Sequence, residues 1–147
     1  TDNLINTVNS LNLEESLFKS KKDFGLVTVR AKDFKPIYVF KEDIKKGKLT
    51  DYLMASCYLP IFKMEKLIDD NYYLDGGFYD YAPANALINR GYDKVYVVDL
   101  DAIGFRRKYK DKDKVIVIKP SRKLGSIINI YESRVRENIL MGYYCLL

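Results

Sequence analysis

Short runs rich in β-branched and aromatic residues alternate with polar turns in the first half of the chain. FGLVTVRA (24–31) and KPIYVF (35–40) are two such runs with a brief polar link between them, so they predict a β-hairpin. KLIDDNYYLD (66–75) predicts a second strand pair that turns at residues 69–71. The last of these strands arrives at Asp75.

A helix is expected between the two strand pairs. The run TDYLMASCYL begins with Thr50, a favoured N-cap residue, and Asp51, an acid suited to a first helical turn. Pro60 follows the run and ends it, because the residue before a proline avoids the helical conformation. Residues 1–22 are polar and weakly patterned, which predicts a loop and a short helix.

The second half alternates helical and strand patterns. PANALINRG (83–91) places a proline at the first position of a predicted helix and a glycine at its C-terminal end. KVYVVDL (94–100) and KVIVIKP (114–120) are nearly continuous apolar runs, which predict parallel strands covered on both faces. The last segment has apolar residues at helical spacing, with Ser126 as a candidate cap upstream: Ile128, Tyr131, Val135, Ile139 and Tyr143. This alternation predicts an α/β fold with a mostly parallel sheet.

Length and composition fit one globular domain. The chain has 147 residues, of which 48% are hydrophobic and 31% charged. No apolar run approaches the ~18 residues of a transmembrane helix, and the first residues lack the basic and apolar regions of a signal peptide. The sequence does not begin with Met and ends inside the apolar run GYYCLL. We therefore expect residues 1–147 to be a single partial domain from a longer protein.

The formal charge of +5 comes largely from three clusters, at residues 19–22, 41–48 and 106–114. Acidic residues dilute each cluster, so solvated loops are the simplest interpretation. Contact with anionic lipid headgroups or with nucleic acid is the alternative. We expect no nucleic-acid partner, because the chain shows neither an RNA-binding nor a helix-turn-helix signature.

The absence of histidine limits the available chemistry. Without it the chain can form no His-based metal site, no Ser-His-Asp triad and no Cys-His dyad. Cys57 and Cys145 show no CxxC spacing and lie in predicted helices, so we expect buried, reduced thiols and a cytoplasmic protein. We expect neither a metal nor a cofactor.

Asp75 is the first candidate for chemistry, because ligand sites in α/β sheets lie beyond the carboxyl ends of strands. Asp-Gly between apolar segments is also a strong hairpin signal, since glycine accepts positive φ, and on LDGG alone a turn is the better interpretation. The alternative is a carboxylate on a tight loop, where Gly76 and Gly77 let a backbone or substrate approach closely. Such a carboxylate could be a general base toward a hydroxyl nucleophile.

Three further residues carry weaker signals. Asp99 and Asp101 end an apolar strand as Asp-x-Asp, which resembles the haloacid dehalogenase-like phosphatases, where the pair holds Mg²⁺. Ala and Ile follow where that motif expects Gly-Thr, so acids that cap a loop are the commoner explanation. Ser56 lies outside any Gly-x-Ser-x-Gly elbow and is expected to pack within its helix.

Three segments together resemble the C-terminal half of bacterial patatin-like phospholipases, over roughly residues 20–147. They are LTDYLMASCYLPIFKM, YYLDGGFYDYAPANALINRGYDKVYVVDLD and KPSRKLGSIINIYESRVRENILMGYY. The resemblance implies a three-layer α/β/α sandwich that hydrolyses lipid acyl esters with a Ser-Asp dyad. It implies that Asp75 is the dyad's general base, on the motif with Gly76 and Gly77.

The family's nucleophile elbow and Gly-rich oxyanion loop do not occur in this sequence. We therefore expect the serine to lie upstream, in the other half of the domain, and the chain alone to be inactive. Two alternatives stay open: a non-catalytic binding or scaffold relative, and a Mg²⁺-dependent phosphotransferase that uses Asp99 and Asp101.

Overall fold

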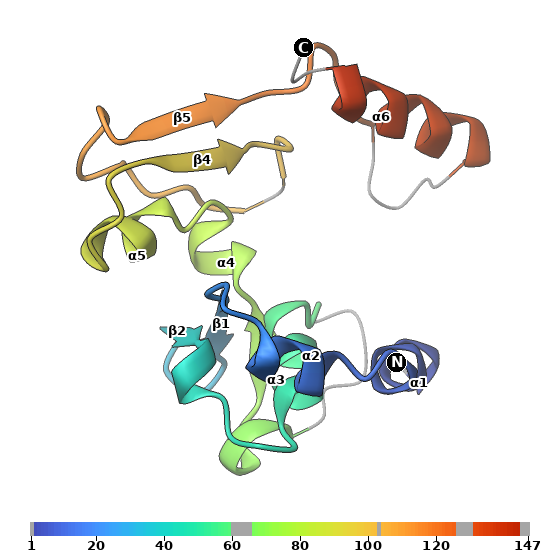
Figure 1. Ribbon diagram of the computed structural model, residues 1–147, viewed down its shortest axis with the longest axis vertical. Helices are drawn as coiled ribbons and strands as arrows, with labels where there is room; N and C mark the ends of the chain where they lie inside the picture. The colour runs from blue at the N-terminus through green and yellow to red at the C-terminus, as the bar shows by residue number, and fades with distance from the viewer. Residues whose placement is uncertain (1, 60–65, 103, 126–130, 145–147) are drawn as a thin grey trace. The chain divides into compact units, whose positions relative to one another are not determined.

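The computed structural model describes residues 2–59, 66–102, 104–125 and 131–144 (Figure 1). Its contacts divide the chain into two compact units. The N-terminal unit comprises Thr1–Tyr81 with Gly104–Arg106, and the C-terminal unit comprises Ala82–Ile103 with Arg107–Leu147. That both units belong to one partial domain stays a prediction.

The N-terminal unit contains a three-stranded antiparallel sheet with the strand order β2-β1-β3. The predicted hairpin is confirmed, with β1 and β2 paired from Gly25 opposite Phe40 to Arg30 opposite Lys35. The elements of this unit are α1 (Asp2–Ser10), α2 (Leu13–Lys19), β1 (Gly25–Arg30), β2 (Lys35–Phe40), η1 (Lys41–Asp43), α3 (Leu49–Ser56), η2 (Ile68–Asp70), β3 (Tyr73–Asp75) and α4 (Gly77–Asp80).

The strand pair predicted within residues 66–75 is wrong. Residues 68–70 form the short helix η2, in which Asp69 and Asp70 have φ of 49° and 59°, and only residues 73–75 are a strand. That strand, β3, pairs with β1 instead of folding back on residues 66–68. Pairing with β1 adds β3 to an existing sheet, whereas a hairpin alone is marginally stable in water.

The N-cap of α3 is Lys48, two residues before the predicted N-cap Thr50. The Thr50 hydroxyl donates to Asn9 Oδ1 at 2.7 Å. Glu14, on α2, satisfies the helix start instead: its carboxylate accepts the N–H groups of Gly47 at 2.5 Å and Leu49 at 3.1 Å. The helix ends at Ser56, and the predicted stop at Pro60 lies outside the described residues.

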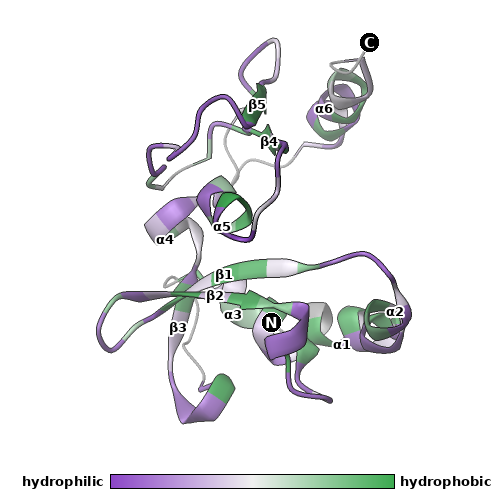
Figure 2. Ribbon diagram, turned by 60° about the vertical axis from the view of Figure 1, so that its left-hand side comes forward, coloured by the Kyte–Doolittle hydropathy of each residue, from purple (hydrophilic) through white to green (hydrophobic). Residues whose placement is uncertain are grey.

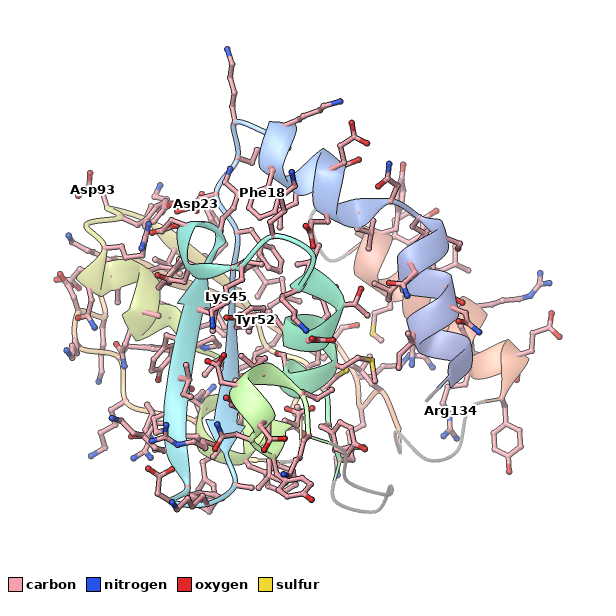
Figure 3. All side chains as sticks on the ribbon, turned by 90° about the horizontal axis from the view of Figure 1, so that it is seen from below. Phe18, Asp23, Lys45, Tyr52, Asp93 and Arg134 are labelled. Atoms are coloured by element: carbon pink, nitrogen blue, oxygen red, sulfur yellow. The ribbon has the colours of Figure 1, made fainter. Side chains whose placement is uncertain are left out.

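The core of the N-terminal unit lies between α3 and the three-stranded sheet. Figure 3 shows Lys45 beside Tyr52, a buried core residue on α3. Lys45 donates to Asp69 at 2.7 Å, and this ion pair raises the pKa of Lys45. The buried cluster comprises Val39, Ile44, Leu49, Tyr52, Ala55, Ile68 and Tyr73.

The C-terminal unit contains α5 (Ala84–Asn89), β4 (Val95–Val98), β5 (Val115–Ile118) and α6 (Glu132–Tyr144). The predicted helix at 83–91 is confirmed within one residue at its start. Gly91, with φ of 87°, donates to Ile88 and Tyr92 donates to Leu87, which is a complete Schellman motif. The parallel pairing of β4 with β5 is also confirmed.

Among the described residues, only one face of this parallel pair is covered, which corrects the prediction of strands buried on both faces. Along β4, Val95 and Val97 are buried and α5 lies against the strand, but Tyr96 and Val98 are 60% and 64% exposed. On the open side, a groove of about 440 Å³ runs between the strand ends and α6. Its lining includes Val98 and Ile118 on the strands and Ile139 on α6.

The helical spacing predicted for the last segment forms α6, but its apolar side chains are not buried. Tyr131, Val135, Ile139 and Tyr143 are exposed by 40–71%. Ser126 and Ile128 lie outside the described residues. The chain is thus a mixed α/β protein with one small antiparallel and one small parallel sheet. Within the described ranges, none of the helices has the length and hydropathy to cross a membrane.

Candidate functional site

Asp75 is the last residue of β3, an edge strand of the antiparallel sheet. Two backbone hydrogen bonds hold it there. The Asp75 N–H donates to the Tyr58 carbonyl at 2.8 Å, and the Gly76 N–H donates to the Ser56 carbonyl at 3.3 Å. The segment after α3 and the end of β3 therefore hold each other in place.

Thr28, on β1, connects β1 with α3 and β3. It lies opposite Asp75 in the pairing of β1 with β3 and is completely buried. Its hydroxyl lies 2.7 Å from the Ala55 carbonyl on α3 and 3.0 Å from the Leu74 carbonyl on β3. A buried hydroxyl shared by two carbonyls is costly to remove, because both acceptors would lose a partner.

Gly76 is required for space rather than for an unusual backbone conformation. Its φ of −58° is ordinary, so the prediction that a positive-φ turn needs glycine here is wrong. A Cβ at this position would lie 2.3 Å from the Val27 carbonyl oxygen. The hairpin interpretation of LDGG is also wrong, because the short helix α4 follows Gly76. The close approach of another backbone, the alternative reason for glycine, is what the structure contains.

The Asp75 carboxylate is half-buried and has one oxygen held in place. Oδ1 accepts the Gly77 N–H at 2.7 Å. Within the part of the chain that the structure describes, no hydrogen bond reaches Oδ2. The arrangement fixes the orientation of the carboxylate and leaves one oxygen able to accept a proton from a hydroxyl.

A segment far along the sequence pairs with this turn, and the sequence analysis missed it. The Phe105 N–H donates to the Gly77 carbonyl at 3.1 Å, and the Phe105 carbonyl accepts the Tyr81 N–H at 2.9 Å. Gly104, with φ of 149°, passes so close to Gly77 that a Cβ would lie 2.2 Å from the Gly77 oxygen. The sequence signal for this pairing is the glycine followed by an aromatic residue in AIGFRR. It was missed because this segment lacks the alternation of a strand.

The residues that could compete as nucleophiles have other roles. The Ser56 hydroxyl donates to the Val27 carbonyl at 2.8 Å, in keeping with the expected packing role. Cys57 is exposed rather than buried as predicted, because α3 ends just before it. Partial desolvation of the thiol raises the pKa of Cys57, and the negative charge of Asp75 raises it further, which disfavours the reactive thiolate. Cys145 lies outside the described residues.

Asp99 and Asp101 form a turn at the end of β4. Asp99 is buried, and its Oδ1 accepts the Asp101 N–H at 3.1 Å. Asp101 is exposed and has φ of 52°. The carboxylate of Asp99 thus caps the loop that follows the strand, as the commoner explanation of the Asp-x-Asp pattern expects. In the described ranges no three His, Cys, Asp or Glu side chains cluster as metal ligands would.

Comparison with known families shows what the chain is similar to, over the segment that includes the first of these candidates. A profile of the patatin-like phospholipase family matches residues 4–88, which is more than half of the chain and includes the Asp75 turn. The chain belongs to the patatin-like phospholipase family. Membership implies kinship with lipid acyl hydrolases. The match ends within α5, before the Asp99 turn and α6. No curated protein and no solved structure matches the chain.

Proposed function

We propose that this patatin-like chain supplies the general base of a lipid acyl hydrolase, and that Asp75 is that base. The observation that carries the proposal is the Asp75 carboxylate, which lies within the family match with Oδ1 held by Gly77 N–H. Gly76 supports it by allowing Val27 to approach the turn, and Gly77 supports it through the N–H that holds Oδ1. The substrate class is a lipid or other acyl ester.

The chemistry proposed for Asp75 is proton transfer. As a serine oxygen attacks the acyl carbon, its proton passes to the free Asp75 oxygen, and the same proton then protonates the alcohol that leaves. Water repeats the cycle and releases the fatty acid. General-base assistance of this kind contributes about 10²–10⁴-fold to the rate. No metal or cofactor enters these steps.

The serine of the proposed dyad lies outside these residues. The chain has seven serines and none lies in a Gly-x-Ser-x-Gly elbow. We propose that the chain is the C-terminal half of a three-layer α/β/α patatin-like domain. The upstream half would then supply the elbow and the oxyanion loop.

Two assays test the proposal. The purified 147-residue chain should hydrolyse p-nitrophenyl acyl esters no faster than its Asp75→Ala variant; turnover above that variant would refute the absence of a nucleophile. A longer chain that includes the preceding reading frame should be active and should lose at least about 10²-fold on Asp75→Asn. Asp51→Asn, a change on the surface of α3 away from the strand end, is the matched control and should keep full activity.

The non-catalytic alternative predicts a different outcome. If the preceding reading frame lacks a Gly-x-Ser-x-Gly elbow after a strand, or if Asp75→Asn leaves the longer chain fully active, the base assignment fails. The chain would then be a binding or scaffold relative of the hydrolases. The Mg²⁺-dependent phosphotransferase is the other alternative. It would be supported if metal-dependent phosphotransfer were lost on Asp99→Asn but not on Asp75→Asn.

A further inference from the structure

The side chain of Phe105 is 67% exposed although its backbone is fixed. Its N–H and its carbonyl are both bonded to the segment around α4, through Gly77 and Tyr81. Gly104 packs against Gly77 immediately before it. The backbone of this segment is therefore held on both sides, and its ring points to solvent from a fixed position.

Cationic side chains follow the exposed ring along the chain. Arg106, Arg107 and Lys108 are exposed, and between residues 105 and 114 six basic residues stand against two acidic ones. The connection from β4 to β5 is accordingly coloured mostly as hydrophilic in Figure 2. An exposed aromatic ring within a cationic run is the composition that binds anionic membrane surfaces, where the ring enters the headgroup region and the cations meet lipid phosphates.

This segment is bonded to the same residue as the candidate base. The Gly77 N–H donates to Asp75, and the Gly77 carbonyl accepts from Phe105. Gly77 thus connects the Asp75 carboxylate to the backbone of Phe105, whose ring is exposed. A bilayer that contacts Phe105 would lie beside the strand end that carries Asp75.

We propose that Phe105 and the cations that follow it in the sequence, Arg106, Arg107 and Lys108, are a segment that docks on anionic bilayers, and that Phe105 thereby brings Asp75 to its lipid substrate. Docking is a property of this segment alone, whereas delivery of Asp75 rests on the proposed function. The two can be tested separately, because docking needs no ester hydrolysis.

The test is co-sedimentation of the purified chain with vesicles of ether-linked phosphatidylcholine, with and without ether-linked phosphatidylserine. We expect binding to the anionic vesicles that is lost at high salt, because the charge attraction is screened. Arg106→Gln with Arg107→Gln and Lys108→Gln should weaken partitioning by roughly 100-fold, at roughly fivefold for each charge. Phe105→Ala should weaken it by about tenfold, since its ring no longer enters the interface.

The matched control is Lys32→Gln with Phe34→Ala, in the turn between β1 and β2. That turn also presents an exposed aromatic ring, 49% exposed at Phe34, beside a lysine. The control should bind vesicles like the unchanged chain, and circular dichroism melts should confirm that every variant is folded. The proposal would be overturned if the control lost vesicle binding equally, or if the chain did not bind vesicles at all. It would also be overturned if the chain bound single-stranded RNA equally well and Phe105→Ala left that binding unchanged.

Discussion

Position 76 has no room for a side chain, because a Cβ there would lie 2.3 Å from the Val27 carbonyl oxygen and 2.4 Å from Val27 Cγ1. Gly76→Ala must therefore push β1 away from the turn that carries Asp75. We expect it to destabilise the N-terminal unit by about 1–3 kcal/mol or more, the usual cost of overpacking. Urea unfolding followed by far-UV circular dichroism measures the change.

The control for this substitution is Gly142→Ala. Gly142 lies in α6 with nothing within 4 Å of an added Cβ, so alanine should leave stability unchanged or raise it by up to ~1 kcal/mol through helix propensity. If Gly76→Ala proved as harmless as Gly142→Ala, the close approach of Val27 to the turn would be wrong.

The ion pair at the turn between β1 and β2 predicts a pH dependence. Hydrogen bonds from Arg30 to Asp33, at 2.7 and 2.9 Å, lower the pKa of Asp33 from 3.8 to about 2. Because the folded-state pKa is depressed, the stabilisation is present above pH 3.8 and is lost as the pH falls through about 2. Arg30→Gln should return the Asp33 pKa to its ordinary range in an NMR titration, whereas Lys32→Gln should not.

Asp75 could be singled out from the sequence, but the reasons for its setting could not. A strand that arrives at Asp-Gly-Gly and a helix that follows are local patterns, and both are present. The partners that hold the turn, Val27 and Phe105, are distant in sequence, and no local pattern connects either of them to Asp75. The local pattern predicted that Gly76 is needed for a positive φ, whereas the structure requires it for the close approach of Val27. Both situations favour glycine, so the sequence alone cannot distinguish them.

For the elements, the start of α3 gives the clearest test. Glu14 accepts the N–H groups of Gly47 and Leu49, so it does at long range what an N-cap side chain does locally. Glu14→Ala should cost about 0.5–2 kcal/mol, the usual loss on removal of a cap. Thermal melts measure it.

Glu15→Ala is the control for this cap. Glu15 lies on the same helix, and within the described part of the chain it pairs with exposed Lys19 and Asn12. Its removal should leave the melting temperature unchanged. Equal effects of the two substitutions would mean that loss of a negative charge, and not loss of the cap, is responsible.

Elements defined by short-range chemistry were predicted well, whereas of those defined by distant partners the parallel pairing of β4 with β5 was predicted and others were not. The hairpin of β1 and β2 and the Gly91 end of α5 follow from neighbouring residues, and both are confirmed. Thr50 was a sound N-cap candidate, yet Glu14 outcompetes it from another helix. The pairing of β3 with β1 likewise depends on a strand more than forty residues earlier in the chain.

For the complete chain, the uncovered side of the parallel pair matters most. Parallel sheets are normally covered on both faces, but here Tyr96, Val98 and Ile116 are 40–64% exposed on one face. Apolar runs alone could not reveal this, because a strand buried on both faces and a strand with one open face have the same composition when both faces are apolar. The open face is what a missing half of the domain would be expected to cover.

Exposed apolar faces and open strand edges favour self-association. We therefore expect the purified chain to associate as its concentration rises, measured by analytical ultracentrifugation. Val98→Lys places a charge on the 64% exposed position of β4 and should shift the chain toward monomer, without a loss of helix or strand signal. Leu11→Lys, at a position 59% exposed between α1 and α2, adds the same charge elsewhere and should leave association unchanged. A chain that sediments as one monomer at every concentration and melts cooperatively would contradict the half-domain proposal, because the uncovered face would then need no partner.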